Sequence, residues 1–158
     1  MSTKLLSADA LDALCAQARA APRRRAHLNL HEDADAPVQR FAIAAEPDSY
    51  FRPHRHPAVW ELLCVLRGRF LSLQFDDDGV LTQRAVVDAR TPIIETPANT
   101  FHTVLALDGG SVFFEIKQGP YRPTPEQDFV AWAPAEGGDV APLQRWLREA
   151  QPGQRYAG

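Results

Sequence analysis

Two histidines and a glutamate lie close together in the segment RPHRHPAVWELLCVLRG, residues 52–68. His54 and His56 are one residue apart, so in an extended strand both imidazoles point to the same face. Glu61 follows five positions after His56, and it reaches that face if the intervening residues bend or bulge. Side chains of these types are ligands for a divalent metal ion, and here they would form one wall of a metal site.

We expect the fourth ligand to be His102, in the segment ETPANTFHTV, residues 95–104. Pro97 and Asn99 predict a tight turn before it, because asparagine tolerates the left-handed backbone that such turns need. Three imidazoles and one carboxylate suit iron, manganese, zinc, nickel or cobalt. A six-coordinate ion would keep two positions for water or substrate and could act as a Lewis acid or bind dioxygen. The sequence therefore predicts one divalent metal ion per chain, against the alternative of two surface histidines and an unrelated core histidine.

Three further residues are candidates for catalysis: His31, Glu115 and Lys117. His31 either faces the pocket as an acid–base or substrate-binding group or points to solvent before an acidic turn. Glu115 and Lys117 alternate with apolar residues in one segment, so they share a face. That face lines the barrel in one interpretation and faces solvent in the other, and the pattern does not decide between them.

The candidates for substrate binding are three consecutive arginines and one tyrosine: Arg23, Arg24, Arg25 and Tyr121. Arginine binds phosphate through its planar guanidinium group, as a nucleotide-sugar would require. The alternative is a solvated run that stabilises the end of the preceding helix. Tyr121 and Trp132 are expected mainly to pack the C-terminal segment over the rest of the chain.

The elements that must position these residues are one helix, a series of strands and a second helix. Residues 7–20 predict a helix with Ser7 as its N-cap and Pro22 beyond its end. Strand-length segments separated by turn signals such as DDDG and DGG then predict an antiparallel sandwich or barrel. These segments span residues 38–46, 60–68, 69–79, 80–88, 91–97, 101–110 and 111–119. A proline-rich stretch follows, and residues 139–150 predict a short amphipathic helix.

Length and composition are those of one globular domain, with 158 residues, 45% hydrophobic and 23% charged. The net charge of −3 gives no general attraction for nucleic acid or for an anionic membrane surface. We expect a cytoplasmic protein, because no secretory signal is apparent and the two cysteines lack CxxC spacing.

The spacing H-x-H-x4-E-x6-G, at His54, His56, Glu61 and Gly68, resembles the first cupin motif, and the segment from Pro97 to His102 resembles the second. The likeness extends over residues 9–147 to WbuC-type cupin-fold metalloproteins, which are associated with gene clusters for O-antigen and other surface polysaccharides. It rests on the segments RRRAHLNLH, RPHRHP, WELLCVLRGRF, FHTVLAL, VFFEIKQGPY and DFVAWAPAEG. The chain departs from the general cupin pattern at three positions, none of them a metal ligand: Asp48, Asn99 and Ala106.

The resemblance implies an all-β fold, a single cupin barrel (a double-stranded β-helix or jelly roll) with an N-terminal helix and a short C-terminal helix. The expected divisions are the helix and basic linker at 1–26, the barrel at 27–120, and at 121–158 a C-terminal segment whose helix packs on the barrel. The implied function is metal-dependent chemistry on a small polar ligand such as a sugar derivative, by Lewis-acid isomerisation or epimerisation. Alternatives are a metal-dependent dioxygenase, a non-catalytic ligand-binding or regulatory module, and a metal-independent epimerase. The resemblance also implies a homodimer, since cupin barrels often pair through their sheets. ELLCVL has apolar residues on both strand faces, and either a partner subunit or the terminal helices could cover its outside.

Overall fold

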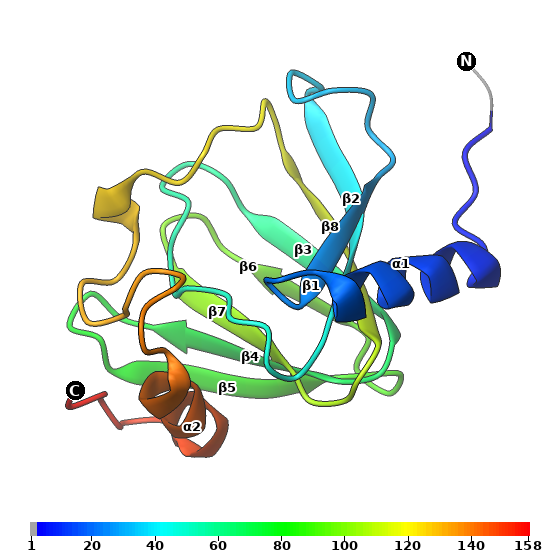
Figure 1. Ribbon diagram of the computed structural model, residues 1–158. Helices are drawn as coiled ribbons and strands as arrows, with labels where there is room; N and C mark the ends of the chain where they lie inside the picture. The colour runs from blue at the N-terminus through cyan, green and yellow to red at the C-terminus, as the bar shows by residue number, and fades with distance from the viewer. Residues whose placement is uncertain (1–2) are drawn as a thin grey trace.

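The structure is a computed structural model that describes residues 3–158, and it begins with helix α1, Ala8–Ala20. Ser7 caps this helix, as the sequence predicts, because its Oγ accepts a hydrogen bond from the backbone N–H of Ala10 at 3.2 Å. The buried face of α1 carries Leu14, Cys15 and Ala18, which pack against the small residues of strand β2. The helix therefore covers the outside of the sheet to which β2 belongs (Figure 1).

Eight strands follow among the described residues: β1 (Arg25–Asn29), β2 (Val38–Ala45), β3 (Glu61–Arg67), β4 (Phe70–Phe75), β5 (Leu81–Val87), β6 (Ile93–Thr96), β7 (Phe101–Ala106) and β8 (Ser111–Gln118). β2 to β8 lie in the segments that the sequence predicts. β1 is an addition to the prediction, and it begins inside the stretch expected to be a basic linker. Arg24, just before β1, adopts a left-handed backbone with φ of 57° and so turns the chain from α1 into this strand. β1 then pairs antiparallel with β2.

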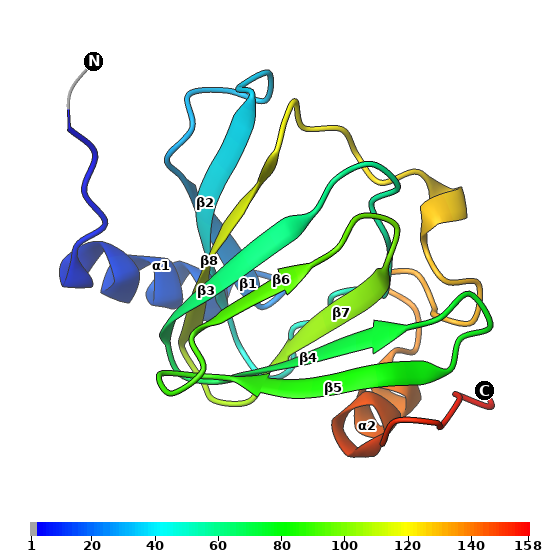
Figure 2. The same ribbon diagram turned by 180° about the vertical axis from the view of Figure 1, so that it is seen from behind.

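The strands form two antiparallel sheets, ordered β1-β2-β8-β3-β6 and β5-β4-β7. Figures 1 and 2 show the two sheets facing each other as the walls of a barrel. Apolar side chains from both walls fill one end of the space between them, including Ile43, Leu63, Phe70, Val104 and Phe113. The prediction of an all-β barrel flanked by two helices is confirmed.

A C-terminal helix, α2 (Ala141–Glu149), covers the outer face of the smaller sheet (Figure 2). Its Leu143 and Leu147 are buried against Leu71, Leu73 and Leu81 of strands β4 and β5. This contact explains why every residue of β4 is buried although strand residues alternate between two faces. Before α2, a short 3-10 helix, Glu126–Asp128, lies in the proline-rich stretch that the sequence predicted to lack regular structure.

Across residues 3–158, no helix has the length and apolar character that crossing a bilayer requires.

Candidate metal centre and its cavity

Backbone pairing brings the two histidine motifs together, although they are far apart in sequence. The N–H of His54 donates to the carbonyl of His102 at 3.0 Å, and the N–H of His102 donates back at 2.8 Å. The turn before β7 is fixed to the same segment, because the N–H of Asn99 donates to the carbonyl of His56 at 2.8 Å. Asn99 has φ of 62°, the left-handed conformation that the sequence predicts for this position. The pairing and the turn together hold His54, His56 and His102 on one wall.

Glu61 is the first residue of β3, and it enters the barrel after a turn over the segment PAVW. Its side chain is buried beside the three imidazoles. One ligand atom from each of the four residues lies within 4.8 Å of the others. The structure therefore brings together the four residues that the spacing of the sequence selected as metal ligands.

Hydrogen bonds orient two of the imidazoles for metal binding. Nδ1 of His54 lies 2.8 Å from the carbonyl oxygen of Arg52, and Nδ1 of His102 lies 2.8 Å from that of Thr100. A carbonyl only accepts, so each Nδ1 carries a proton and donates it, which leaves Nε2 as the atom available to a metal. Histidines that bind metals usually have their second nitrogen fixed in this way.

The third imidazole provides a direct test of whether a metal fits. Nε2 of His56 lies 2.8 Å from Oε1 of Glu61 as an ion-pair contact, and this buried nitrogen is without a hydrogen bond among residues 3–158. A buried polar atom without a partner is rare and indicates a missing ion or water. Three imidazoles and a carboxylate are a donor set that a divalent transition metal accepts. The residues present therefore fit one metal ion.

The protonation states in the cluster follow from burial and from neighbouring charges. Burial, together with the nearby His102, lowers the pKa of His54 to about 3, so His54 is neutral at ordinary pH. Burial opposes charge on His102 as well, but the hydrogen bond from its Nε2 to Oε2 of Glu61, 2.8 Å long, raises its pKa. Burial likewise opposes ionisation of Glu61, and its imidazole partners and Lys117 outweigh burial and lower its pKa.

Glu115 and Lys117 both face the inside of the barrel, which decides the orientation that the sequence left open. Lys117 lies directly opposite Glu61 in the pairing of β8 with β3. Its Nζ lies 2.8 Å from Oε1 of Glu61 and 2.8 Å from Oε1 of Glu115. Burial, with the charge of Glu61 added, raises the pKa of Glu115 to about 7. Burial opposes charge on Lys117, but the two carboxylates outweigh it and raise the pKa of the ammonium group.

A cavity of about 500 Å³ extends from the four-residue cluster into the barrel, within the range of small-molecule sites. Most of the predicted catalytic and substrate-binding residues line it: His31, Glu115, Lys117, Arg23, Arg25 and Tyr121. Nδ1 of His31 lies 3.0 Å from both the backbone N–H and the carbonyl oxygen of Arg40, so the backbone of β2 holds this nitrogen and Nε2 is the ring nitrogen left for a ligand. Arg24 is not among the lining residues, and its guanidinium group pairs with Asp48 at 3.0 Å instead.

One of the three arginines differs from a solvated helix cap. Arg25 is buried at the start of β1, where it donates to the carbonyl of Tyr50 and lies over the ring of Phe51, 4.5 Å from its centroid. Burial lowers its pKa, and Glu136 only partly offsets this effect. The expectation of a solvated arginine run therefore fails for Arg25, because the chain enters a sheet at this residue.

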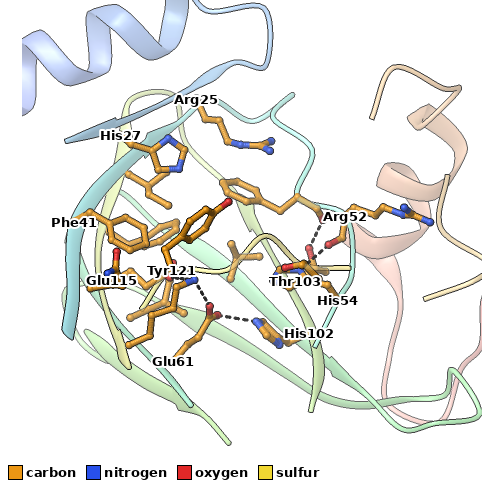
Figure 3. A pocket seen from close by; sticks show the side chains of 18 of the residues that line it. Arg25, His27, Phe41, Arg52, His54, Glu61, His102, Thr103, Glu115 and Tyr121 are labelled. Atoms are coloured by element: carbon orange, nitrogen blue, oxygen red, sulfur yellow. Dashed lines mark hydrogen bonds and ion pairs between the residues drawn. The ribbon is translucent and has the colours of Figure 1, made fainter. Parts of the chain in front are cut away.

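His27, Asn29 and Arg52 also line the cavity and were not selected from the sequence. Arg25, His27, Asn29 and His31 occupy alternate positions, so β1 and its extension direct them all toward the cavity. Figure 3 shows Arg25 and His27 of this series. A strand assignment for RAHLNLH would have identified this series, because polar residues occur there with a period of two.

Comparisons with known proteins agree with this architecture. No curated protein matches the sequence. The cupin domain of Cnp3 from Schizosaccharomyces pombe is 5% identical, with a TM-score of 0.50 over 60% of this chain and 64% of that one. KdgF from Halomonas sp. is 16% identical, with a TM-score of 0.49 over 62% of this chain and 82% of that one. BH2720 from Bacillus halodurans is 23% identical, with a TM-score of 0.47 over 55% of this chain and 66% of that one.

The two sheets, with the likeness to the Cnp3 cupin domain, show a cupin-type β-barrel fold. A family model described as "Domain of unknown function (DUF6016)" matches residues 6–87, which is more than half of the sequence. The chain therefore belongs to the DUF6016 family.

Proposed function

We propose that the protein is a mononuclear metal-dependent cupin that acts on a small polar molecule, such as a sugar or sugar derivative, by isomerase-like or epimerase-like chemistry. The observation that carries the proposal is the four-residue cluster, whose ligand atoms lie within 4.8 Å of one another at the edge of a cavity of ligand size. When bound, a divalent ion supplies a Lewis acid that polarises an oxygen of the substrate. His54, His56, Glu61 and His102 would hold it.

Proton transfer is the task that the remaining residues support. Isomerisation or epimerisation through an enediol or enolate requires a proton to leave one carbon atom and a proton to be returned to carbon. Glu115 has a pKa of about 7 and lines the cavity, so near neutral pH it can either accept or donate a proton. Lys117 holds this carboxyl group beside Glu61. His31 also lines the cavity and offers its Nε2 as a further polar contact for the substrate.

The biological setting belongs to the same proposal. The resemblance of six segments to WbuC-type proteins supports a role in the biosynthesis of surface polysaccharides in the cytoplasm. A homodimer is supported by exposed apolar side chains on the larger sheet, where Leu66 is 42% and Ile93 is 56% exposed. Burial of such a patch is a common reason for subunits to pair.

The experiment that tests the proposal is elemental analysis of protein purified without a metal-affinity tag, followed by activity screens. We expect about one divalent transition metal ion per chain, as four ligands from one chain imply. His54→Ala and His102→Ala should lose most of it and keep the far-ultraviolet circular dichroism of the barrel. Isomerase screens with nucleotide-sugars then follow for zinc or manganese. Full metal retention in both variants, or no uptake after reconstitution, would refute the proposal.

Ferrous iron would direct the screen to oxygen consumption, since iron supports the dioxygenase alternative and zinc does not. An oxygen-consuming reaction dependent on bound iron would replace isomerisation as the assigned chemistry.

A further inference from the structure

The cavity has a second polar end, which we call the β1 end and define by Arg23, Arg25, His27 and Asn29. All four residues line the cavity. In Figure 3, Arg25 and His27 lie at the opposite side of the cavity from Glu61 and His102. A ligand that fills the cavity therefore meets one polar group at the metal cluster and another at the β1 end.

The wall between the two ends is largely apolar. It includes Phe41, Ile43, Phe51, Leu63 and Phe113. Rings and aliphatic groups of this kind pack against the carbon skeleton of a ligand but offer it no hydrogen bonds. Polar groups of the ligand should therefore concentrate at its two extremities.

The β1 end already binds a carboxylate, which the chain itself supplies. Glu136, from the segment before α2, lies 2.6 Å from Nε of Arg23 and 2.5 Å from Nη2 of Arg25. Burial opposes ionisation of Glu136, yet the hydrogen bonds from both arginines outweigh burial and lower its pKa. Two guanidinium groups share one carboxylate, so a positive charge remains without a counterpart in this group of three residues.

His27 is a further polar group at the β1 end, beside the same arginines. Its imidazole lines the cavity and has no hydrogen-bond partner in the part of the chain that the structure describes. Burial lowers its pKa, and the charges of Arg25, Arg23 and Lys117 lower it further, with no acidic group acting in the opposite direction. An anion beside His27 would therefore enter a region where the surrounding charges are positive, and the imidazole is free to bind it.

We propose that the ligand spans the cavity and carries an anionic group, a phosphate or a carboxylate, which binds at the β1 end to Arg23, Arg25 and His27. This inference rests on the proposed function, because it assigns the other end of the ligand to the metal. Glu136 then acts as an internal competitor, whose carboxylate occupies the anion site until a ligand displaces it. Guanidinium groups form paired hydrogen bonds with either type of anion.

The test measures the affinity of the full chain for methyl phosphate and for acetate by isothermal titration calorimetry, with zinc-loaded and with EDTA-treated protein. Arg23→Gln should weaken binding of the preferred anion about tenfold, because a charge-assisted hydrogen bond is lost. Glu136→Gln should strengthen it by a similar factor, since the competing charge is removed. Arg24→Gln is the matched control and should leave the affinity unchanged, because Arg24 pairs with Asp48 away from the cavity.

The two probes separate the possible sources of the anion, since tighter binding of methyl phosphate indicates a phosphorylated ligand and tighter binding of acetate a carboxylic acid. Equal effects of Arg23→Gln and Arg24→Gln would overturn the inference, as would no anion binding to the Glu136→Gln variant. Anion binding that requires zinc and is unchanged in the Arg23→Gln variant would place the anion at the metal. The proposed function would then stand, and the inference of an anion site at the β1 end would fail. Binding that depends on Arg23 in a protein that takes up no metal would leave the anion site standing and refute the proposed function.

Discussion

Lys117 is the residue on which the charge balance of the metal cluster depends. Its ammonium group lies 2.8 Å from one carboxylate oxygen of Glu61 and 2.8 Å from one of Glu115, and both glutamates are buried. Like charges held close together in a buried place repel each other strongly unless a cation lies between them. Without a bound metal ion, Lys117 supplies positive charge between the two carboxylates in this part of the barrel.

Lys117→Met should therefore destabilise the metal-free protein more than the metal-loaded protein. We expect a loss of about 3 kcal/mol in the free energy of unfolding in EDTA, since removal of one partner leaves a buried charge uncompensated. A saturating divalent ion supplies positive charge at Glu61, so the loss should shrink by about half when zinc is bound. Urea unfolding followed by tryptophan fluorescence measures both values.

Lys4→Met is the control for that variant, because Lys4 forms an exposed ion pair with Glu32, with side chains 42% and 57% exposed. Such pairs contribute less than about 1 kcal/mol. The same loss for Lys117→Met with and without zinc would contradict the assignment of Lys117 to the charge balance of the cluster.

Individual residues also show how far the sequence alone can lead. The four proposed metal ligands could be selected because their spacing is short and their residue types are unusual together. Whether Glu115 and Lys117 face inward could not be decided, because strand parity depends on the pairing of β8 with β3, which is a long-range contact. Arg24 and Arg25 are neighbours of one type with different environments, since a left-handed turn at Arg24 directs one outward and the other into the sheet.

At the scale of elements, the turn before β7 connects the two halves of the candidate metal site. Asn99 holds a left-handed backbone there while its N–H bonds to the carbonyl of His56. The sequence indicated this turn because its chemistry is local, and most strands were predicted for the same reason. β1 was missed because it is short and follows a run of arginines. Its place at the sheet edge is fixed by pairing with β2 rather than by its own composition.

Asn99→Ala should destabilise the protein by about 1 kcal/mol, because a Cβ-bearing residue without a short polar side chain resists the left-handed conformation. Asn99→Gly keeps the N–H and tolerates that conformation, so its stability should stay within about 0.5 kcal/mol of the parent protein. Urea unfolding of the two variants side by side provides the measurement. If the alanine and glycine variants are equally stable, then the left-handed backbone at this turn does not require Asn99.

For the whole molecule, the buried histidines couple folding to pH. The ordinary pKa of a histidine is 6.5, while that of His54 in the folded protein is about 3. At pH values between these two, His54 is protonated in the unfolded chain but not in the folded protein, so the stability of the folded state falls as the pH decreases. Glu61 acts in the same direction, because its lowered pKa stabilises the folded state above the ordinary value of 4.5, and this contribution is lost in acid. His102 acts in the opposite direction, since its raised pKa gives a contribution that is lost as the pH rises through that value.

The metal-free protein should therefore lose stability from pH 6.5 downward, by up to about 1.4 kcal/mol per pH unit for each proton that the unfolded chain takes up in excess. Urea unfolding at a series of pH values in EDTA measures this slope. Trp132 and Trp146, which contact each other beside α2, are suited to report the transition by fluorescence. His54→Gln removes the titrating imidazole and should reduce the fall in stability between pH 6.5 and 4.5, a window in which Glu115, with its pKa raised to about 7, acts in the opposite direction in both proteins. His27→Gln is the comparison variant, because His27 has a pKa shifted in the same direction but lies at the β1 end, away from the cluster. If His54→Gln keeps the full slope, the acid sensitivity of the barrel arises outside the candidate metal site.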